Sequence, residues 1–340
     1  MATVILQCFD LNATGGSPIE KLLFPFMVIL IGLLLGIVLK MVEASERIKN
    51  VNRLFGFSTK FVLFVLNPVI LIGVFWTVNI NDPKLFLIPL LGAVCLILGG
   101  IFALIISKIL KLDRQQKGAM FISGSFTNFG LFGTMFCFSF LGEGSLAYVA
   151  LFRLFEDFIY YTVGYPVAKS YSQSKQTKDK LINVILRMAK DPFIIIAIVG
   201  ITVGGILSYS SIERPNFYSS LIELFVPMAT LLLMIPIGYR IKVEAIKKYM
   251  KESFSISFVK FIMVPVCMTS LAYFVGLGEL ENGMVLKVIL ILSVMPPAFV
   301  SVIPTQIYKL DIDLANSSLI LNSGLLIIIL PIINFIINLS

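Results

Sequence analysis

The chain has 340 residues, of which 58% are hydrophobic and 14% are charged, and its mean hydropathy is +0.97. These values exclude an ordinary soluble domain and predict an all-α protein that crosses the lipid bilayer many times. The net charge of +8 would suit nucleic acid, but the basic residues occur in short loops between apolar segments. That pattern sets orientation in a membrane, so we expect no nucleic-acid partner.

The chain contains no histidine. Its absence excludes histidine-based catalytic triads and HExxH zinc sites. No other pairing of nucleophile and base stands out in the sequence. We therefore expect no enzyme, no metal site and no cofactor.

After an N-terminal segment, residues 1–19, ten apolar windows are each long enough to cross a bilayer, at about 20 residues per span. The predicted spans are Leu22–Leu39, Leu54–Thr77, Leu85–Ile109, Gly118–Leu141, Ser145–Ala168, Pro192–Ser208, Leu221–Tyr239, Phe254–Val275, Met284–Tyr308 and Leu314–Asn338.

Most of the 27 lysine and arginine residues fall in loops on one side of these spans. The opposite side has only Lys21, Lys84, Arg214 and Lys287. Because basic loops stay in the cytoplasm, we expect both termini and residues 1–19 to be extracytoplasmic. The protein is predicted to be a multi-pass protein of the plasma or inner membrane.

A hydrophilic stretch at 171–190 divides the ten spans into five and five, and we interpret it as a cytoplasmic linker. Five is an odd number, so a duplicated unit would return with inverted topology, as repeats 20–170 and 191–340. Both halves open with Pro-Phe followed by a Gly-x-x-x-Gly pattern, at 25–36 and 192–204. The pattern is common in membrane helices, so it supports the duplication only modestly.

The fourth span, Gly118–Leu141, has a polar and glycine-rich centre. This centre comprises Ser123, Gly124, Ser125, Thr127, Asn128, Gly130, Gly133 and Thr134. Hydrocarbon offers these groups no hydrogen-bond partner, so broken backbone at this depth has to lie within protein or against a cavity. We predict an interrupted helix that lines a site.

The ninth span is predicted to be interrupted as well, because Pro296 and Pro297 remove two amide donors at its centre. Broken spans at matching positions of two repeats point to the midplane site of a secondary transporter, where the two helices cross. A kinked packing helix with small contact residues is the alternative for either span. The matching positions favour the site.

Half-helix N-termini that meet in the membrane present free amides and positive partial charge, which suits an anion. The candidate substrate-binding residues are Asn128, Ser125, Thr127, Gly130, Pro296, Pro297 and, before a proline in the second span, Asn67. Asn128 can bind a carboxylate, but it can equally satisfy the broken helix itself. Asn67-Pro68 is expected to break the second span.

Arg153, Glu156 and Asp157 lie within the fifth span, with the acids three and four residues after the arginine. The spacing places them on one helix face. They form either a self-neutralising structural cluster, which we favour, or a coupling site in which one acid titrates. Lys260 is expected to snorkel to the cytoplasmic interface.

Three stretches resemble the auxin efflux carrier family: SFTNFGLFGTMF at Ser125–Phe136, MPPAFVSVIPTQIYKLD at Met295–Asp311 and AKDPFIIIAIVG at Ala189–Gly200. The resemblance implies a ten-helix inverted-repeat fold, related to bile-acid/sodium and sodium/proton carriers, with a scaffold domain and a transport domain. It implies organic-anion transport, of auxin in plants or malate and malonate in bacteria, and homodimerisation.

The same resemblance places Asn128, Pro296 and Pro297 at the crossover. Two positions depart from the family pattern. Met135 stands where the family has proline, and Asp191, at the start of the second repeat, stands where it has asparagine. An acid at position 191 would repel an anion unless it were protonated or paired, so Asp191 is a candidate site residue through which the substrate preference of the family does not carry over.

These observations predict a secondary transporter that moves a small organic carboxylate by alternating access of a crossed-helix domain. One alternative is a symporter of the same fold, in which backbone carbonyls with Glu156 or Asp157 hold Na⁺ or H⁺. The other is a membrane receptor or sensor that binds an organic acid without moving it. A transport assay with and without an imposed ion gradient tests the symporter alternative. Accumulation of labelled substrate in liposomes distinguishes a transporter from a receptor.

Overall fold

The computed structural model describes residues 18–44, 51–78, 82–172, 192–210, 212–240 and 247–339. Within these ranges the regular elements are helices, and the one backbone pairing outside helices is an isolated bridge between Thr127 and Pro297. The predicted N-terminal segment (up to residue 17), most of the linker, and Asp191 lie outside them.

Six helical stretches in the described ranges are long and apolar enough to cross a membrane. They are Glu20–Glu43, Val51–Thr77, Pro83–Ile109, Phe217–Arg240, Met250–Phe274 and Ile312–Asn338. These stretches match the first, second, third, seventh, eighth and tenth predicted spans. Phe129–Leu141 and Ile194–Tyr209 are shorter apolar helices. The chain is therefore an all-helical protein with the composition of a membrane protein.

The chain divides into two compact units, and each takes segments from both halves of the sequence. The first unit comprises Met1–Asp82, Thr134–Ala150 and Pro192–Ile241. The second unit comprises Pro83–Gly133, Leu151–Asp191 and Lys242–Ser340. The fold thus joins helices that are distant in sequence.

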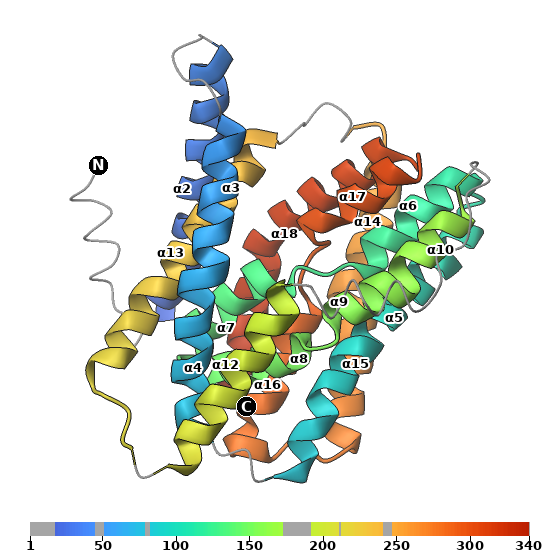
Figure 1. Cartoon of the computed structure of the whole chain (residues 1–340). Coiled ribbons are helices and arrows are strands. Elements are labelled where there is room, and N and C mark those ends of the chain that lie inside the picture. The colour runs from blue at the N-terminus through green and yellow to red at the C-terminus, as the bar shows by residue number, and fades with distance from the viewer. Residues whose placement is uncertain are drawn as a thin grey trace. The chain divides into compact units, whose positions relative to one another are not determined.

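In the first unit, helix α2 (Pro18–Ala44) lies along α13 (Phe217–Arg240), as Figure 1 shows. The contact is close at the glycines of α2, because a Cβ placed on Gly36 would lie 2.1 Å from the carbonyl oxygen of Ile235. Small residues let membrane helices approach in this way. The Gly-x-x-x-Gly pattern of the first span is therefore a packing contact.

The second Gly-x-x-x-Gly pattern has the same use. Helix α12 (Pro192–Tyr209) packs on α4 (Asn67–Thr77), and a Cβ on Gly204 would lie 2.7 Å from the carbonyl oxygen of Ile72. The first predicted span thus packs on the seventh, and the sixth packs on the second.

We expect Gly36→Ala to destabilise the protein by about 1–3 kcal/mol, because the added methyl group forces two helix backbones apart. Gly324→Ala is the matched control, since a Cβ at that helical position of α18 (Ile312–Leu339) meets nothing within 4 Å. Thermal unfolding in detergent measures both. Equal melting temperatures for the two variants would contradict the close contact.

Three of the prolines within helices follow a π-helical turn. These turns are η1 (Val62–Leu66), η4 (Tyr160–Gly164) and η5 (Val259–Met263), and each ends two residues before Pro68, Pro166 or Pro265. A wider turn relieves the clash of the proline ring and its missing amide. The prediction that Asn67-Pro68 breaks the second span was wrong: the Asn67 amide donates to Val62 and the helix continues.

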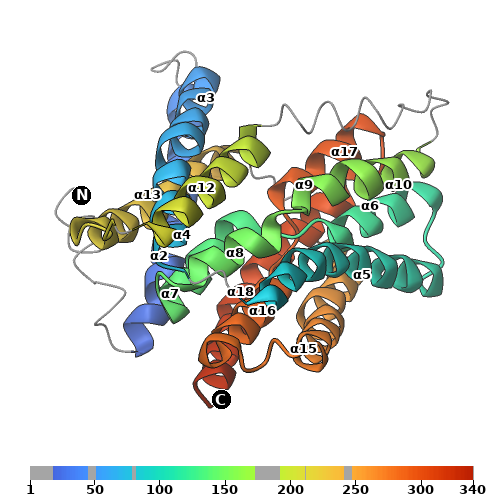
Figure 2. The same ribbon diagram turned by 60° about the horizontal axis from the view of Figure 1, so that its bottom comes forward.

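In the second unit, α5 (Leu87–Ile109) and α6 (Arg114–Ser125) lie side by side (Figure 2). Helix α6 begins with a capping box, in which the Asp113 carboxylate accepts from the Gln116 amide and the Gln116 side chain accepts from the Asp113 amide. Gly99 and Gly124 meet where the two helices touch, since a Cβ on Gly99 would lie 2.2 Å from the Gly124 oxygen. This contact fixes the end of α6, where the first break begins.

Candidate functional site

The helices at the fourth and ninth predicted spans are interrupted, and both interruptions lie in the second unit. Helix α6 ends at Ser125 and the helical path resumes with η3 (Phe129–Gly133). Helix α16 (Met284–Ser293) ends at Ser293, and the 3₁₀ turn η7 (Phe299–Ser301) follows. We call residues 126–128 and 294–298 the paired breaks.

The paired breaks satisfy each other's backbone. The Asn128 amide donates to the Pro296 carbonyl at 2.9 Å, and the Ala298 amide donates to the Phe126 carbonyl at 3.0 Å. Thr127 lies opposite Pro297 in this short antiparallel pairing. Proline has no amide to leave unpaired and favours extended backbone, so the Pro-Pro pair suits this position.

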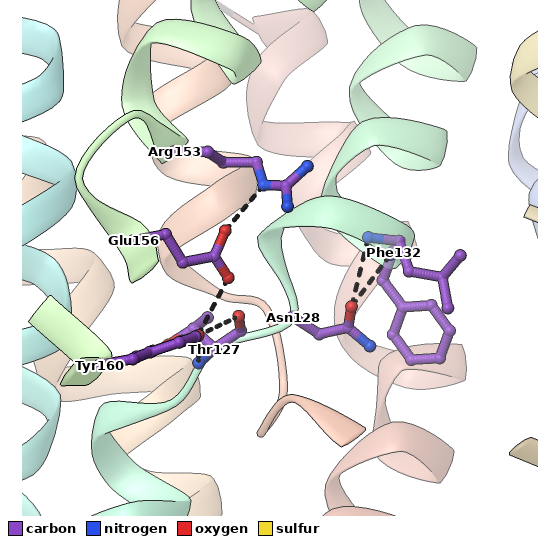
Figure 3. A network of polar contacts seen from close by, with 7 residues as sticks. Thr127, Asn128, Phe132, Arg153, Glu156 and Tyr160 are labelled. Carbon is purple, nitrogen blue, oxygen red and sulfur yellow. Dashed lines mark hydrogen bonds and ion pairs between the residues drawn. The ribbon is translucent and has the colours of Figure 1, made fainter. Parts of the chain in front are cut away.

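Asn128 also caps the second half of its own span. Its Oδ1 accepts from the amides of Leu131, at 3.3 Å, and Phe132, at 3.5 Å (Figure 3). Asparagine is a favoured residue for this use at a helix start. Its Nδ2 is buried and has no hydrogen-bond partner. The side chain thus supports the broken helix with its oxygen and keeps a free donor.

Other buried polar atoms near the paired breaks also lack partners. In the described part of the chain, they are the Oγ atoms of Ser123, Ser125 and Ser301. Buried polar groups are hydrogen-bonded in the great majority of cases. A group of unsatisfied donors around broken backbone therefore marks a place where a polar ligand can bind.

The fifth-span charges are tied to the first break. Arg153 Nε donates to Glu156 Oε2 at 2.8 Å, and the Tyr160 hydroxyl lies 3.0 Å from Glu156 Oε1 (Figure 3). The same hydroxyl accepts from the Thr127 amide and lies 3.1 Å from the Thr127 carbonyl. This network links the ion pair to the backbone of the first break.

The predicted single helix face for these charges was wrong. Helix α8 (Ser145–Arg153) ends at Arg153 and α9 (Glu156–Ile159) begins at Glu156, with a turn between them. The ion pair forms across that turn. Asp157 is half-buried beside this ion pair, and its carboxylate attracts the Arg153 guanidinium electrostatically.

Arg153 lies directly against the first break. A Cβ placed on Gly130 would lie 2.5 Å from Arg153 Nη2 and 2.6 Å from Cζ. Only glycine leaves room for a guanidinium group there. The side chain of Arg153 is 36% exposed, so the ion pair with Glu156 does not bury it completely.

The expectation that Lys260 snorkels to the interface was wrong. Lys260 is 1% exposed and lies on η5, between α14 (Met250–Phe258) and α15 (Val264–Phe274). Its Nζ donates to Thr127 Oγ1 at 2.5 Å. The side chain therefore points to the first break.

A family described as membrane transport protein matches residues 17–334. The chain belongs to this family of membrane transport proteins. An uncharacterized transporter from Methanocaldococcus jannaschii is 25% identical over 240 residues, which are 69% of this chain and 74% of the relative. The family is auxin efflux carrier-like, so the resemblance is confirmed at that level.

The protein is thus a multi-pass integral membrane protein of a transporter family. Of its predicted site residues, the structure brings together Ser125, Thr127, Asn128, Gly130, Pro296 and Pro297. Asn67 belongs to the first unit, where it is half-buried in a continuous helix.

Sequence reasoning missed Tyr160 and misplaced Lys260. The one local signal for Tyr160 is its position four residues after Glu156, which puts both side chains on one helix face. Tyr160 also stacks on Phe126 of the first break, with ring centroids 3.9 Å apart. No local signal distinguishes Lys260 from a lysine that snorkels.

We expect Tyr160→Phe to keep the stacking but to lower stability by about 1–3 kcal/mol, because it leaves the buried Thr127 amide without its partner. Tyr273→Phe, at an exposed tyrosine of α15, is the control and is expected to be neutral. Differential scanning fluorimetry in detergent compares them. An unchanged melting temperature for Tyr160→Phe would show that the network contributes nothing to the first break.

Proposed function

We propose that this membrane transport protein is a secondary transporter of a small organic carboxylate, which binds at the paired breaks. The observation that carries the proposal is the buried and unpartnered Nδ2 of Asn128, together with the Arg153 guanidinium that lies against Gly130. A carboxylate has only acceptors, so it complements free donors and a guanidinium group.

The electrostatics of the half-helix favour the same ligand. The apolar helix Phe129–Leu141 begins at the first break, so its N-terminal partial positive charge faces the breaks. The Arg153 guanidinium adds a full charge at Gly130. Glu156 neutralises part of this positive charge through its ion pair with Arg153. The site therefore attracts a carboxylate without carrying a large net positive charge.

For the architecture, we propose ten spans as a 5+5 inverted repeat, with the fourth and ninth helices crossing at the paired breaks. The swapped packing of α2 on α13 and of α12 on α4 supports this, since inverted copies exchange equivalent contacts. The proposal includes cytoplasmic basic loops, extracytoplasmic termini and, by family likeness, a homodimer. Transport would proceed by alternating access.

Counterflow in proteoliposomes tests the function. A thermal-shift screen of mono- and dicarboxylates, with malonate, malate and indole-3-acetate among them, selects the probe. Liposomes loaded with that unlabelled acid are then expected to accumulate its labelled form transiently. Saturable binding without accumulation would indicate a receptor, and an absence of binding by every acid would overturn the carboxylate proposal.

Coupling to a cation is tested in the same liposomes. Accumulation driven by an imposed Na⁺ gradient would favour the Na⁺ symporter, with carbonyls of the breaks and Glu156 or Asp157 as ligands. Accumulation driven by a proton gradient would favour H⁺ coupling. Uptake that ignores both gradients would indicate a uniporter.

A further inference from the structure

Lys260 is a buried lysine that has no role in the carboxylate site proposed above. Its nitrogen lies at the first break, 2.5 Å from Thr127 Oγ1. The Thr127 hydroxyl directs its own hydrogen to the Ser125 carbonyl, at 3.3 Å, so its oxygen is an acceptor toward Lys260. A lysine this buried is rare unless it is paired.

No carboxylate in the described part of the chain forms an ion pair with Lys260. Glu156 and Glu143 pair with Arg153 and Arg214 instead. The titratable group facing Lys260 from α5 is the Cys95 thiol. From Thr127 the hydrogen-bond network continues to Tyr160 and Glu156, and Glu156 is already paired with Arg153. An ammonium enclosed in this way lacks a counter-charge, which is unfavourable.

A seam of buried polar side chains runs from Lys260 toward the Met250 end of its helix. On this helix, Ser253 and Ser257 precede Lys260 by seven and three residues and therefore share its face. Helix α18 faces them with Ser318 and Asn322, whose Nδ2 donates to the Ser253 carbonyl at 3.3 Å. Asn322 Oδ1 has no partner. We call Ser253, Ser257, Ser318 and Asn322 the polar seam.

We propose that Lys260 is the proton-binding group of the transporter, and that it gains one proton when a substrate carboxylate binds at the paired breaks. The proposal rests on the carboxylate site proposed above. In the empty site Lys260 is a neutral amine that donates to Thr127. Binding brings in one carboxylate and one proton from water, and the ammonium becomes the counter-ion of the substrate.

The stoichiometry follows from charge balance. For a monocarboxylate, one carboxylate and one proton enter and leave together, so the loaded site carries the same net charge as the empty one and transport is electroneutral symport with H⁺. A dicarboxylate such as malonate takes up the same single proton at Lys260 and carries one net negative charge with it. The polar seam places hydroxyl and amide groups on the helix face between its Met250 end and Lys260, and we take this face as the route by which the proton reaches Lys260.

Proton counting tests the inference. Calorimetric titration of the full chain with malonate, in two buffers of different ionisation enthalpy, gives the protons taken up per malonate bound. We expect close to one for the wild type and close to zero for Lys260→Met and Lys260→Arg. Lys260→Met should also weaken binding roughly 10- to 100-fold, the effect of losing one charge-assisted hydrogen bond.

The two variants separate a proton site from a structural lysine. Lys260→Arg keeps a permanent charge, so it should bind malonate without proton uptake. Lys287→Met removes a half-buried lysine of α16 and should keep the count near one. A count near one in either Lys260 variant, or near zero in the wild type, would overturn the role of Lys260 while carboxylate binding stands. If malonate does not bind to any variant and the other screened acids also fail, both proposals fall.

Discussion

We expect Asn128→Ala to reduce transport at least 100-fold while the protein stays folded. The substitution removes the free Nδ2 donor at the paired breaks and the Oδ1 cap on Leu131 and Phe132. Loss of a hydrogen bond to a charged ligand costs about 1.5–3 kcal/mol, and loss of a cap costs about 1 kcal/mol. Initial rates of labelled-acid uptake and thermal unfolding measure the two effects separately.

Asn128→Asp distinguishes these roles of the side chain. Aspartate retains an oxygen that caps a helix start, so unfolding should be nearly normal, but it replaces the donor with a negative charge that repels a carboxylate. Asn338→Ala, at an exposed asparagine near the end of α18, is the control and should transport normally. Normal transport by Asn128→Ala would remove Asn128 from the site.

The second large effect is expected for Gly130→Ala. The new methyl group would lie within 2.8 Å of three guanidinium atoms of Arg153, so the arginine has to leave the first break. The tip of a long side chain moves at small cost to folding, and we expect transport to fall roughly 10- to 100-fold with little change in melting temperature.

A double-mutant cycle tests that mechanism. If Gly130→Ala acts by displacing Arg153, it should add almost nothing to the transport defect of Arg153→Ala. Gly56→Ala, where a Cβ meets nothing within 4 Å, is the control for a helical glycine. Fully additive defects in the double variant would show that Gly130 acts through the backbone of the break and not through Arg153.

The ion pair of Arg153 with Glu156 bears on whether the cluster of Arg153, Glu156 and Asp157 is structural or a coupling site. Its hydrogen bonds through Tyr160 to Thr127 give it a structural use, since they hold the first break. Arg153 also lies against Gly130, where a substrate is proposed to bind. We therefore propose both a structural role and a substrate-binding role for the cluster, and we assign proton coupling to Lys260 instead.

Local sequence patterns predicted much of the fold. Hydropathy identified the apolar helices, because burial in lipid demands a long uninterrupted run of apolar residues. Glycines, serines and prolines marked the interruptions after Ser125 and after Ser293, because proline removes an amide and glycine weakens a helix wherever they occur. The same local signal identified the residues near the breaks as candidate site residues.

The sequence alone thus determined that this chain is a membrane protein with two interrupted helices, since those properties reside in single residues and short windows. Only the tertiary structure decided that Thr127 pairs with Pro297, that Tyr160 joins Glu156 to the first break, and that Lys260 points inward. The bond from Lys260 to Thr127 joins residues 133 positions apart. Its direction depends on how helices pack, and helix packing is a property of the whole second unit that no local pattern encodes.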